Sequence, residues 1–158
     1  MVGFTYGQKN VYILKSFLVK GKRPLIKWGM LPDNTFFEGA TPEGFSLAVT
    51  PSEGHVIIDV DRHGNIDGFE NIPSEILKEL NMTLNYKTKN DGKHYWFNYT
   101  GDEVLANKSS KIGIDLRTNN GYVVYYPDND VRDQMYLVKD SSENMNNWLQ
   151  SLFGYINK

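Results

Sequence analysis

Seven short runs of β-branched, aromatic or alternating residues constrain the fold of this chain more than any other feature. Such runs predict strands, and they cover residues 11–19, 45–50, 55–61, 83–88, 94–100, 112–117 and 122–127. Three of the intervening turns end in glycine, as short hairpin loops often do: "PSEG" (51–54), "KNDG" (89–92) and "TNNG" (118–121). We therefore expect three hairpins and a largely antiparallel sheet.

Two segments have helical rather than strand periodicity. Residues 72–81 have proline and serine near their start and carry apolar residues on one face, and residues 141–156 begin with two serines. The stripe of Met145, Trp148, Leu149, Leu152 and Phe153 in the second segment is typical of core packing rather than of a ligand site. Strands joined by hairpins with interspersed flanking helices predict an α+β fold.

Length and composition limit the possible classes of protein. A chain of 158 residues with 40% hydrophobic residues and no repeat or linker predicts a single domain, residues 1–158. The absence of cysteine excludes disulfides, thiol catalysis and cysteine-ligated zinc. We find neither a membrane span nor a secretory signal, so no membrane partner and a cytoplasmic location are expected.

Charge is informative only locally, because the formal net charge is −2 and gives no overall signature of a nucleic-acid-binding protein. Basic residues gather in two stretches, "LVKGKRPLIKWG" (18–29) and "YKTKNDGKHYW" (86–96). Both are candidate polyanion-binding surfaces. The alternative is that these lysines only keep strand edges and turns soluble.

Acidic side chains stand on strands whose other side is apolar. In "HVIIDVD", Asp59 and Asp61 share one side because side chains alternate along a strand, and Asp115 stands in the same way opposite the apolar residues of "IGIDLR". His94 begins a third strand, on the side that also carries Trp96. Clustered carboxylates repel one another and favour a hard divalent cation, Mg²⁺ or Mn²⁺. Alternatively, the two aspartates simply mark the polar end of a strand.

Four segments together resemble the primase-polymerase (prim-pol) domain of the archaeo-eukaryotic primase superfamily, which occurs in phage and plasmid replication proteins. They are "KRPLIKW", "AVTPSEGHVIIDVDRHG", "YKTKNDGKHYWF" and "GIDLRTNNGYVVYYP", and they span about residues 20–127. The resemblance implies an RRM-like catalytic core, followed here by the helix at 141–156. The family's acidic pair, its small-residue-x-His motif and its hydrophobic-Asp motif occur in the same order as in this chain.

The resemblance also implies roles for individual residues. Asp59, Asp61 and Asp115 would be the catalytic residues that hold two divalent metal ions, Mg²⁺ or Mn²⁺, and His94 would contact the triphosphate of the incoming nucleotide. Lys93 and Arg117 are further candidates for nucleotide binding. For Arg117 the alternative is a structural ion pair with one of the acids. Many relatives carry glutamate where this chain has Asp61, but aspartate also supplies a hard oxygen ligand.

By resemblance, the chain is expected to be a template-dependent DNA primase or polymerase of a phage, plasmid or prophage replication system. It would transfer nucleotides from NTP or dNTP to a 3′-hydroxyl. The expected partners are template and primer DNA, the nucleotide, and a replicative helicase or further domains of a larger replication protein. The expected location is the cytoplasm of a prokaryote or of a phage-infected host. Two alternatives are a degenerate module that binds nucleotides or single-stranded DNA without catalysis, and a metal-dependent nuclease.

Overall fold

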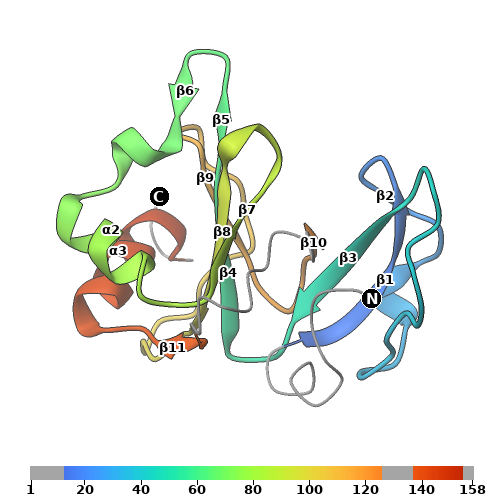
Figure 1. Ribbon diagram of the computed structural model, residues 1–158. Helices are drawn as coiled ribbons and strands as arrows, with labels where there is room; N and C mark the ends of the chain where they lie inside the picture. Colours follow the sequence, from blue (N-terminus) through green and yellow to red (C-terminus); the bar gives the residue numbers. More distant parts are fainter. Residues whose placement is uncertain (1–12, 126–136, 155–158) are drawn as a thin grey trace.

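The computed structural model describes residues 13–125 and 137–154, and most of the strands in these ranges belong to two sheets. The first sheet is antiparallel, with strand order β10-β3-β1-β2. Its strands are β1 (Ile13–Lys20), β2 (Arg23–Pro24), β3 (Ser46–Pro51) and β10 (Val123–Tyr125). It forms the right-hand side of the molecule in Figure 1.

The second sheet is centred on β4, which lies between β8 and β9 and is antiparallel to both. The other edge of β8 pairs with two short strands, antiparallel with β7 and parallel with β11. The strands of this sheet are β4 (His55–Val60), β7 (Asn85–Lys87), β8 (Lys93–Asn98), β9 (Ile114–Arg117) and β11 (Lys139–Asp140). A separate hairpin of β5 (Arg62–His63) and β6 (Ile66–Asp67) follows β4.

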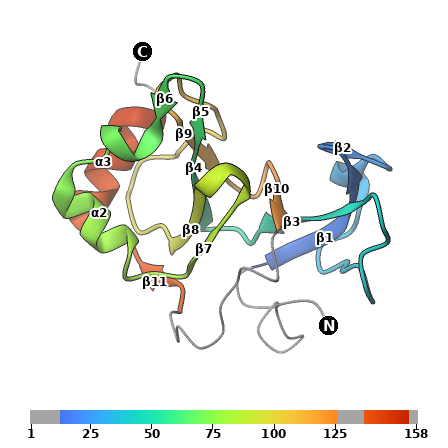
Figure 2. The same cartoon turned by 45° about the horizontal axis from the view of Figure 1, so that its top comes forward.

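Two α-helices, α2 (Ser74–Leu80) and α3 (Glu143–Phe153), lie side by side against one face of the second sheet, as both Figure 1 and Figure 2 show. The side chain of Ser142 caps α3 by accepting a hydrogen bond from the Met145 backbone N–H at 3.1 Å. Short 3₁₀ helices lie at η1 (Trp28–Met30), η2 (Gly68–Asn71) and η3 (Lys89–Asp91). Among the described residues, neither α-helix combines the length and apolar character that crossing a bilayer requires.

Both faces of the second sheet are packed. On the helix side, Val56, Ile58 and Val60 of β4 join the buried residues of α2, α3, β8 and β9 in one apolar cluster. On the opposite side, Ile57 and Trp96 are fully buried against residues of the first sheet. The described residues are therefore layered as helices, second sheet and first sheet.

The predicted α+β fold with mostly antiparallel sheets is confirmed, and each strand and helix expected from the sequence contains an element of that type. The start of the run at 11–19 and the ends of the runs at 122–127 and 141–156 lie outside the described residues. That the core is RRM-like stays a prediction. Of the three expected hairpins only "KNDG" is confirmed, because it joins β7 to its antiparallel partner β8.

The hairpins expected at "PSEG" and "TNNG" are wrong. The first turn joins β3 to β4 and the second joins β9 to β10, and each of these pairs of strands is divided between the two sheets. The turn at "PSEG" does form locally, since the His55 N–H donates to the Ser52 carbonyl at 2.9 Å and Gly54 has φ +86°. Both turns instead pass the chain from one sheet to the other, which brings the two sheets face to face.

Candidate metal and nucleotide site

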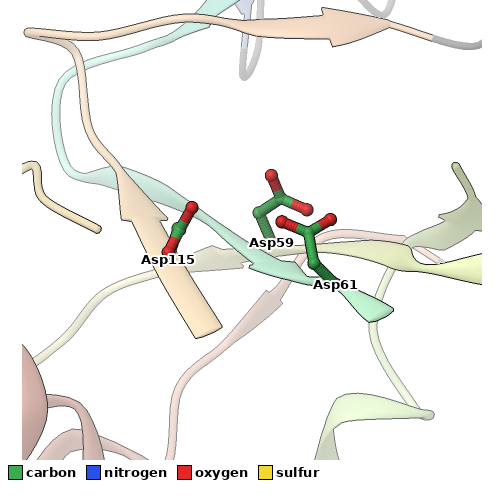
Figure 3. A group of neighbouring side chains, drawn as sticks. All are labelled: Asp59, Asp61 and Asp115. Carbon is green, nitrogen blue, oxygen red and sulfur yellow. The ribbon is translucent and has the colours of Figure 1, made fainter. Parts of the chain in front are cut away.

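The register of the second sheet places three polar side chains in one row across three strands. Asp59 on β4 is the cross-strand partner of His94 on β8 and of Asp115 on β9. Cross-strand partners project from the same side of a sheet, here the side that faces the first sheet. Figure 3 shows the carboxylates of Asp59 and Asp115 on that common side, with Asp61 beside them.

Asp61 lies just beyond the end of β4, and its backbone is held by two glycines. Its N–H donates to the Gly113 carbonyl at 2.9 Å, and its carbonyl accepts from the Gly68 N–H at 2.8 Å. A Cβ on Gly68 would lie 2.2 Å from the Gly113 oxygen, and Gly113 itself has φ +83°. Only glycine fits such an approach and such a backbone conformation without strain. This contact fixes Asp61 next to the row of three.

The three aspartates form a group that fits a metal ion. One carboxylate oxygen from each of Asp59, Asp61 and Asp115 lies within 4.8 Å of the other two, and all three residues are half-buried. Oδ1 of Asp59 is buried and accepts no hydrogen bond from any described group. Its nearest described partner is Nε2 of His94 at 3.4 Å, and a hard divalent cation with oxygen ligands would satisfy this buried acceptor more fully.

The pKa values of the two neighbouring aspartates are shifted in opposite directions. Burial would raise the pKa of Asp59, but the adjacent His94 ring, together with Asp61 and Arg117, outweighs burial and lowers it. Burial and the carboxylates of Asp59 and Asp115 raise the pKa of Asp61 to about 6. The cluster therefore holds more negative charge than the fold favours, and a bound cation would relieve this repulsion.

His94 is held between a carboxylate and a hydroxyl group. Its side chain is only 5% exposed, with Nε2 3.4 Å from Oδ1 of Asp59 and Nδ1 3.2 Å from the Tyr86 hydroxyl. The same hydroxyl accepts a hydrogen bond from Nε1 of Trp96 at 3.0 Å. These contacts fix the orientation of the imidazole ring at the edge of the acidic cluster. Trp96 itself is fully buried and packs in the core between the two sheets.

Gly92, two residues before His94, has to be small for a spatial reason. A Cβ at this position would lie 2.6 Å from the Val60 carbonyl oxygen and 2.8 Å from Oγ1 of Thr88. The turn between β7 and β8 therefore lies directly against the end of the strand that carries the acids. The glycine of "GKH" therefore allows the turn before His94 to approach the end of β4 this closely.

Arg117 lies on the side that carries Asp115, as strand alternation predicts. Its Nη2 is 3.8 Å from Oδ2 of Asp115 and donates to Oγ of Ser109 at 3.4 Å. The other carboxylate oxygen of Asp115 accepts a hydrogen bond from the Ser110 N–H at 3.1 Å. The ion pair that was the alternative for Arg117 is thus present, and a contact to nucleotide stays a prediction.

The structure does not bring Lys93 together with the other five predicted residues. Because Lys93 precedes His94 on β8, its side chain points to the helix side of the sheet. There its Nζ lies 3.4 Å from Oδ1 of Asn85 and 5.9 Å from the centre of the Tyr95 ring. A role for Lys93 in nucleotide binding stays a prediction, and this placement does not favour it.

A cavity of about 790 Å³ opens over the acidic cluster. Asp59, Asp61, His94 and Arg117 lie in its wall, and so do basic residues that the sequence motifs did not single out as site residues. These basic residues are Lys22, Arg62, His63, Lys89 and Lys108. Lys22 and Lys89 belong to the two basic stretches noted in the sequence, and Arg62 directly follows the acidic pair. The sequence therefore contained features that could have identified these three residues as part of the site.

Comparison with known families gives a match over most of the chain. The Prim-Pol family model, described as "Bifunctional DNA primase/polymerase, N-terminal", matches residues 20–148. This range contains all three aspartates, His94 and Arg117. A search of curated proteins finds no match.

Proposed function

Because this chain belongs to the Prim-Pol family of bifunctional DNA primase/polymerases, we propose that it is a template-dependent nucleotidyltransferase. It would transfer a nucleotide from NTP or dNTP to the 3′-hydroxyl of a primer paired to a DNA template. The observation that carries this proposal is the meeting of Asp59, Asp61 and Asp115 within 4.8 Å at the open end of the sheet.

The proposed role of the three aspartates is to hold two divalent cations, Mg²⁺ or Mn²⁺. Such ions, when bound, neutralise the oxygens of the triphosphate and increase the nucleophilicity of the 3′-hydroxyl. The protein would supply a rigid set of oxygen ligands, since glycine contacts fix the backbone of Asp61 and the Ser110 N–H fixes the carboxylate of Asp115. Cation binding would also complete the deprotonation of Asp61, whose pKa is raised to about 6.

His94 and Arg117 are proposed to contact the nucleotide from opposite sides of Asp59. His94 can donate from Nε2, which lies near Asp59, while Tyr86 keeps the ring oriented through Nδ1. Arg117 offers a guanidinium group in the same cavity, where Lys89, Lys108 and Arg62 add positive charge. A positive wall around an acidic centre suits a triphosphate that arrives with bound cations.

We place this activity in the replication system of a phage, plasmid or prophage, in a prokaryotic cell or an infected host. The partners would be template and primer DNA, with a replicative helicase or further domains of a larger replication protein as additional candidates. Residues 1–158 would act as one prim-pol domain, because the acidic cluster draws on β4 and β9 of one sheet and the cavity wall includes residues of the other sheet.

The deciding experiment is a template-directed assay with dNTPs or NTPs, with and without a primer, in Mg²⁺ and in Mn²⁺. We expect metal-dependent extension that the double substitution Asp59→Ala, Asp61→Ala abolishes. A matched control is Glu75→Ala, Glu143→Ala, which removes two exposed acids from the helix side and should leave extension unchanged.

The same assay separates the two alternatives. Shortening of a labelled primer without added nucleotide would indicate a nuclease that uses the same acids. Nucleotide binding without incorporation in either metal would indicate a module that has lost catalysis. Extension by the Asp59→Ala, Asp61→Ala protein would overturn the assignment of the site.

A further inference from the structure

A basic and apolar segment lies at the edge of the first sheet that is opposite β10. Residues 20–31, "KGKRPLIKWGML", contain four basic residues and no acid, although the whole chain has a net charge of −2. All four are exposed: Lys20, Lys22, Arg23 and Lys27. The segment runs from the end of β1 through β2 to η1. This concentration of positive charge complements a polyanion.

The same segment exposes large apolar side chains. Leu25 is 53% exposed, Ile26 52% and Met30 78%, whereas most residues of this kind in the described chain are buried. Apolar side chains gathered at one place on the surface, bordered by charges, mark an interaction site more often than scattered ones do. The partner should therefore offer both negative charge and apolar surface.

Trp28 at the start of η1 forms a preassembled aromatic platform. Its ring stacks on the buried Phe17 with ring centres 5.7 Å apart and an angle of 12° between the planes. Tyr122 meets the Trp28 ring edge-on at 5.4 Å, and its hydroxyl donates to the Lys22 carbonyl at 2.7 Å. Phe17 thus packs against the indole, and the Tyr122 hydroxyl is hydrogen-bonded to the backbone of the segment. Trp28 remains only half-buried.

This platform lies in the wall of the same cavity as the acidic cluster. Lys22, Trp28 and Tyr122 line the cavity that also contains Asp59 and His94. The first sheet therefore contributes an aromatic and basic wall, and the second sheet contributes the acidic one. An extended polymer could contact both walls of the cavity at once.

We infer that Trp28 and the basic segment around it bind single-stranded DNA, specifically the unpaired template. Exposed lysines of residues 20–27 hold the backbone phosphates. A base stacks on the part of the Trp28 indole that remains exposed beside Phe17 and Lys15, whose Nζ lies 5.9 Å from the ring centre. Aromatic stacking with phosphate contacts is how proteins bind single strands without reading sequence. The identification of the strand as the template rests on the proposed polymerase function. The binding itself does not, because no metal is needed for it.

The test measures binding of a fluorescently labelled oligothymidylate in EDTA, so that the metal site plays no part. Loss of one stacked base predicts that Trp28→Leu weakens binding by about 5- to 100-fold, while Trp28→Phe, which keeps a ring on Phe17, loses less. Binding should also quench tryptophan fluorescence. Trp96 is fully buried and Trp148 lies on α3, so the quench should vanish in Trp28→Phe.

A charge variant gives a second measurement that leaves the packing on Phe17 intact. Lys22→Gln, Lys27→Gln should reduce the slope of log affinity against log salt by about 1.4, at about 0.7 for each lost contact to a single strand. The matched control Lys78→Gln, Lys139→Gln changes two exposed lysines on α2 and β11 and should leave the slope unchanged.

Unchanged oligothymidylate affinity in folded Trp28→Leu, or a quench that persists in Trp28→Phe, would overturn the inference. The segment would then be a surface for a protein partner. If thermal unfolding shows that Trp28→Leu does not fold, two other measurements test the inference: the salt dependence of Lys22→Gln, Lys27→Gln and the fluorescence quench in Trp28→Phe. Failure of the polymerase proposal is distinguishable, since wild-type protein would then bind oligothymidylate in EDTA but extend no primer.

Discussion

The two sides of β4 differ in what they contribute, although they belong to one strand of six residues. On the helix side, Val56, Ile58 and Val60 are each at most 4% exposed and pack in the larger apolar cluster. On the other side, Ile57 is fully buried, but Asp59, two residues later, is only half-buried and lies next to two more acids. The helix side of β4 therefore contributes to stability through apolar packing, and the opposite side carries the acidic cluster at its end.

The difference shows that the site is placed where it costs stability. Burial raises the pKa of Asp61 to about 6, and repulsion from the carboxylates of Asp59 and Asp115 adds to this shift. The apolar side has no such conflict and can hold the strand in place. Substitutions on the two sides should therefore separate activity from stability, and the following predictions test that separation.

The largest effect is expected from Asp61→Asn. It removes a metal ligand and should lower primer extension by about 1000-fold or more, since metal ions contribute several kcal/mol to such reactions. The neutral amide resembles the protonated form that the fold favours, so the variant should unfold at higher denaturant concentration than wild type at pH 8 in EDTA. Extension rates and chemical unfolding, measured on the same sample, check both parts.

Asp67→Asn serves as the control for Asp61→Asn. Asp67 lies on β6 outside the acidic cluster, and its Oδ1 pairs with Nε of Arg62 at 3.2 Å. Loss of such an exposed ion pair should change stability by less than about 1 kcal/mol. Asp61→Asn protein that is less stable than wild type in EDTA would contradict the view that the cluster is strained.

The converse is expected from Ile58→Ala on the helix side of the same strand. Truncating this fully buried side chain should lower the free energy of unfolding by about 2–5 kcal/mol, because it leaves a cavity in the apolar cluster. The extension rate per folded molecule should stay close to wild type. Val104→Ala, at a position that is 67% exposed, should change neither quantity appreciably. Equal loss of activity in Ile58→Ala and Asp61→Asn would refute the division between the sides.

An intermediate effect is expected from Gly92→Ala. Gly92 lies against the end of β4, so this substitution should affect both stability and activity. The backbone of Gly92 suits alanine, but the new Cβ would lie 2.6 Å from the Val60 carbonyl oxygen. The turn must move away from β4, which should cost about 1–3 kcal/mol of stability and displace His94. Extension should fall more than in Ile58→Ala. Gly29→Ala, where nothing lies within 4 Å of the new Cβ, is the control for stability.

The sequence predicted the members of the acidic cluster because the rule behind it is local. Alternation along a strand put Asp59 and Asp61 on one side and Asp115 opposite an apolar face, and the structure places them so. Alternation also puts Ile57 on the side of the aspartates, but it does not predict that Ile57 is buried, since covering by the first sheet depends on distant residues. The register that aligns Asp59 with both His94 and Asp115 is likewise a property of the whole sheet.

The glycine-containing sequences predicted the positions of turns better than they predicted which strands pair with each other. Gly54 has the positive φ that its turn signal implies, but the strands on either side of "PSEG" pair elsewhere. A glycine specifies the local path of the backbone, whereas pairing is decided by which apolar faces must be buried together. For the same reason the cavity walls could not be predicted: Lys22 and Arg62 line the same cavity because the two sheets pack against each other.

The smallest effect concerns the pH dependence of stability without metal. The pKa of Asp61 is raised to about 6 in the folded protein, above its ordinary value of 3.8. Its contribution to stability is therefore fully present below pH 3.8 and is lost as the pH rises through 6. Asp59 has a lowered pKa, so its contribution changes only below its ordinary value of 3.8, outside this window.

Between pH 4.5 and 7.5 in EDTA, wild type should therefore lose stability relative to Asp61→Asn, by about 1 kcal/mol because the group is half-exposed and screened. Taking the difference between the two proteins cancels titrations that they share. Mn²⁺ should reverse the trend for wild type, since the ion binds the ionised form and adds stability as the pH rises. A difference between the proteins that is flat from pH 4.5 to 7.5 in EDTA would mean that Asp61 ionises as freely as a surface carboxylate. The acidic side of β4 would then carry no strain for a cation to relieve.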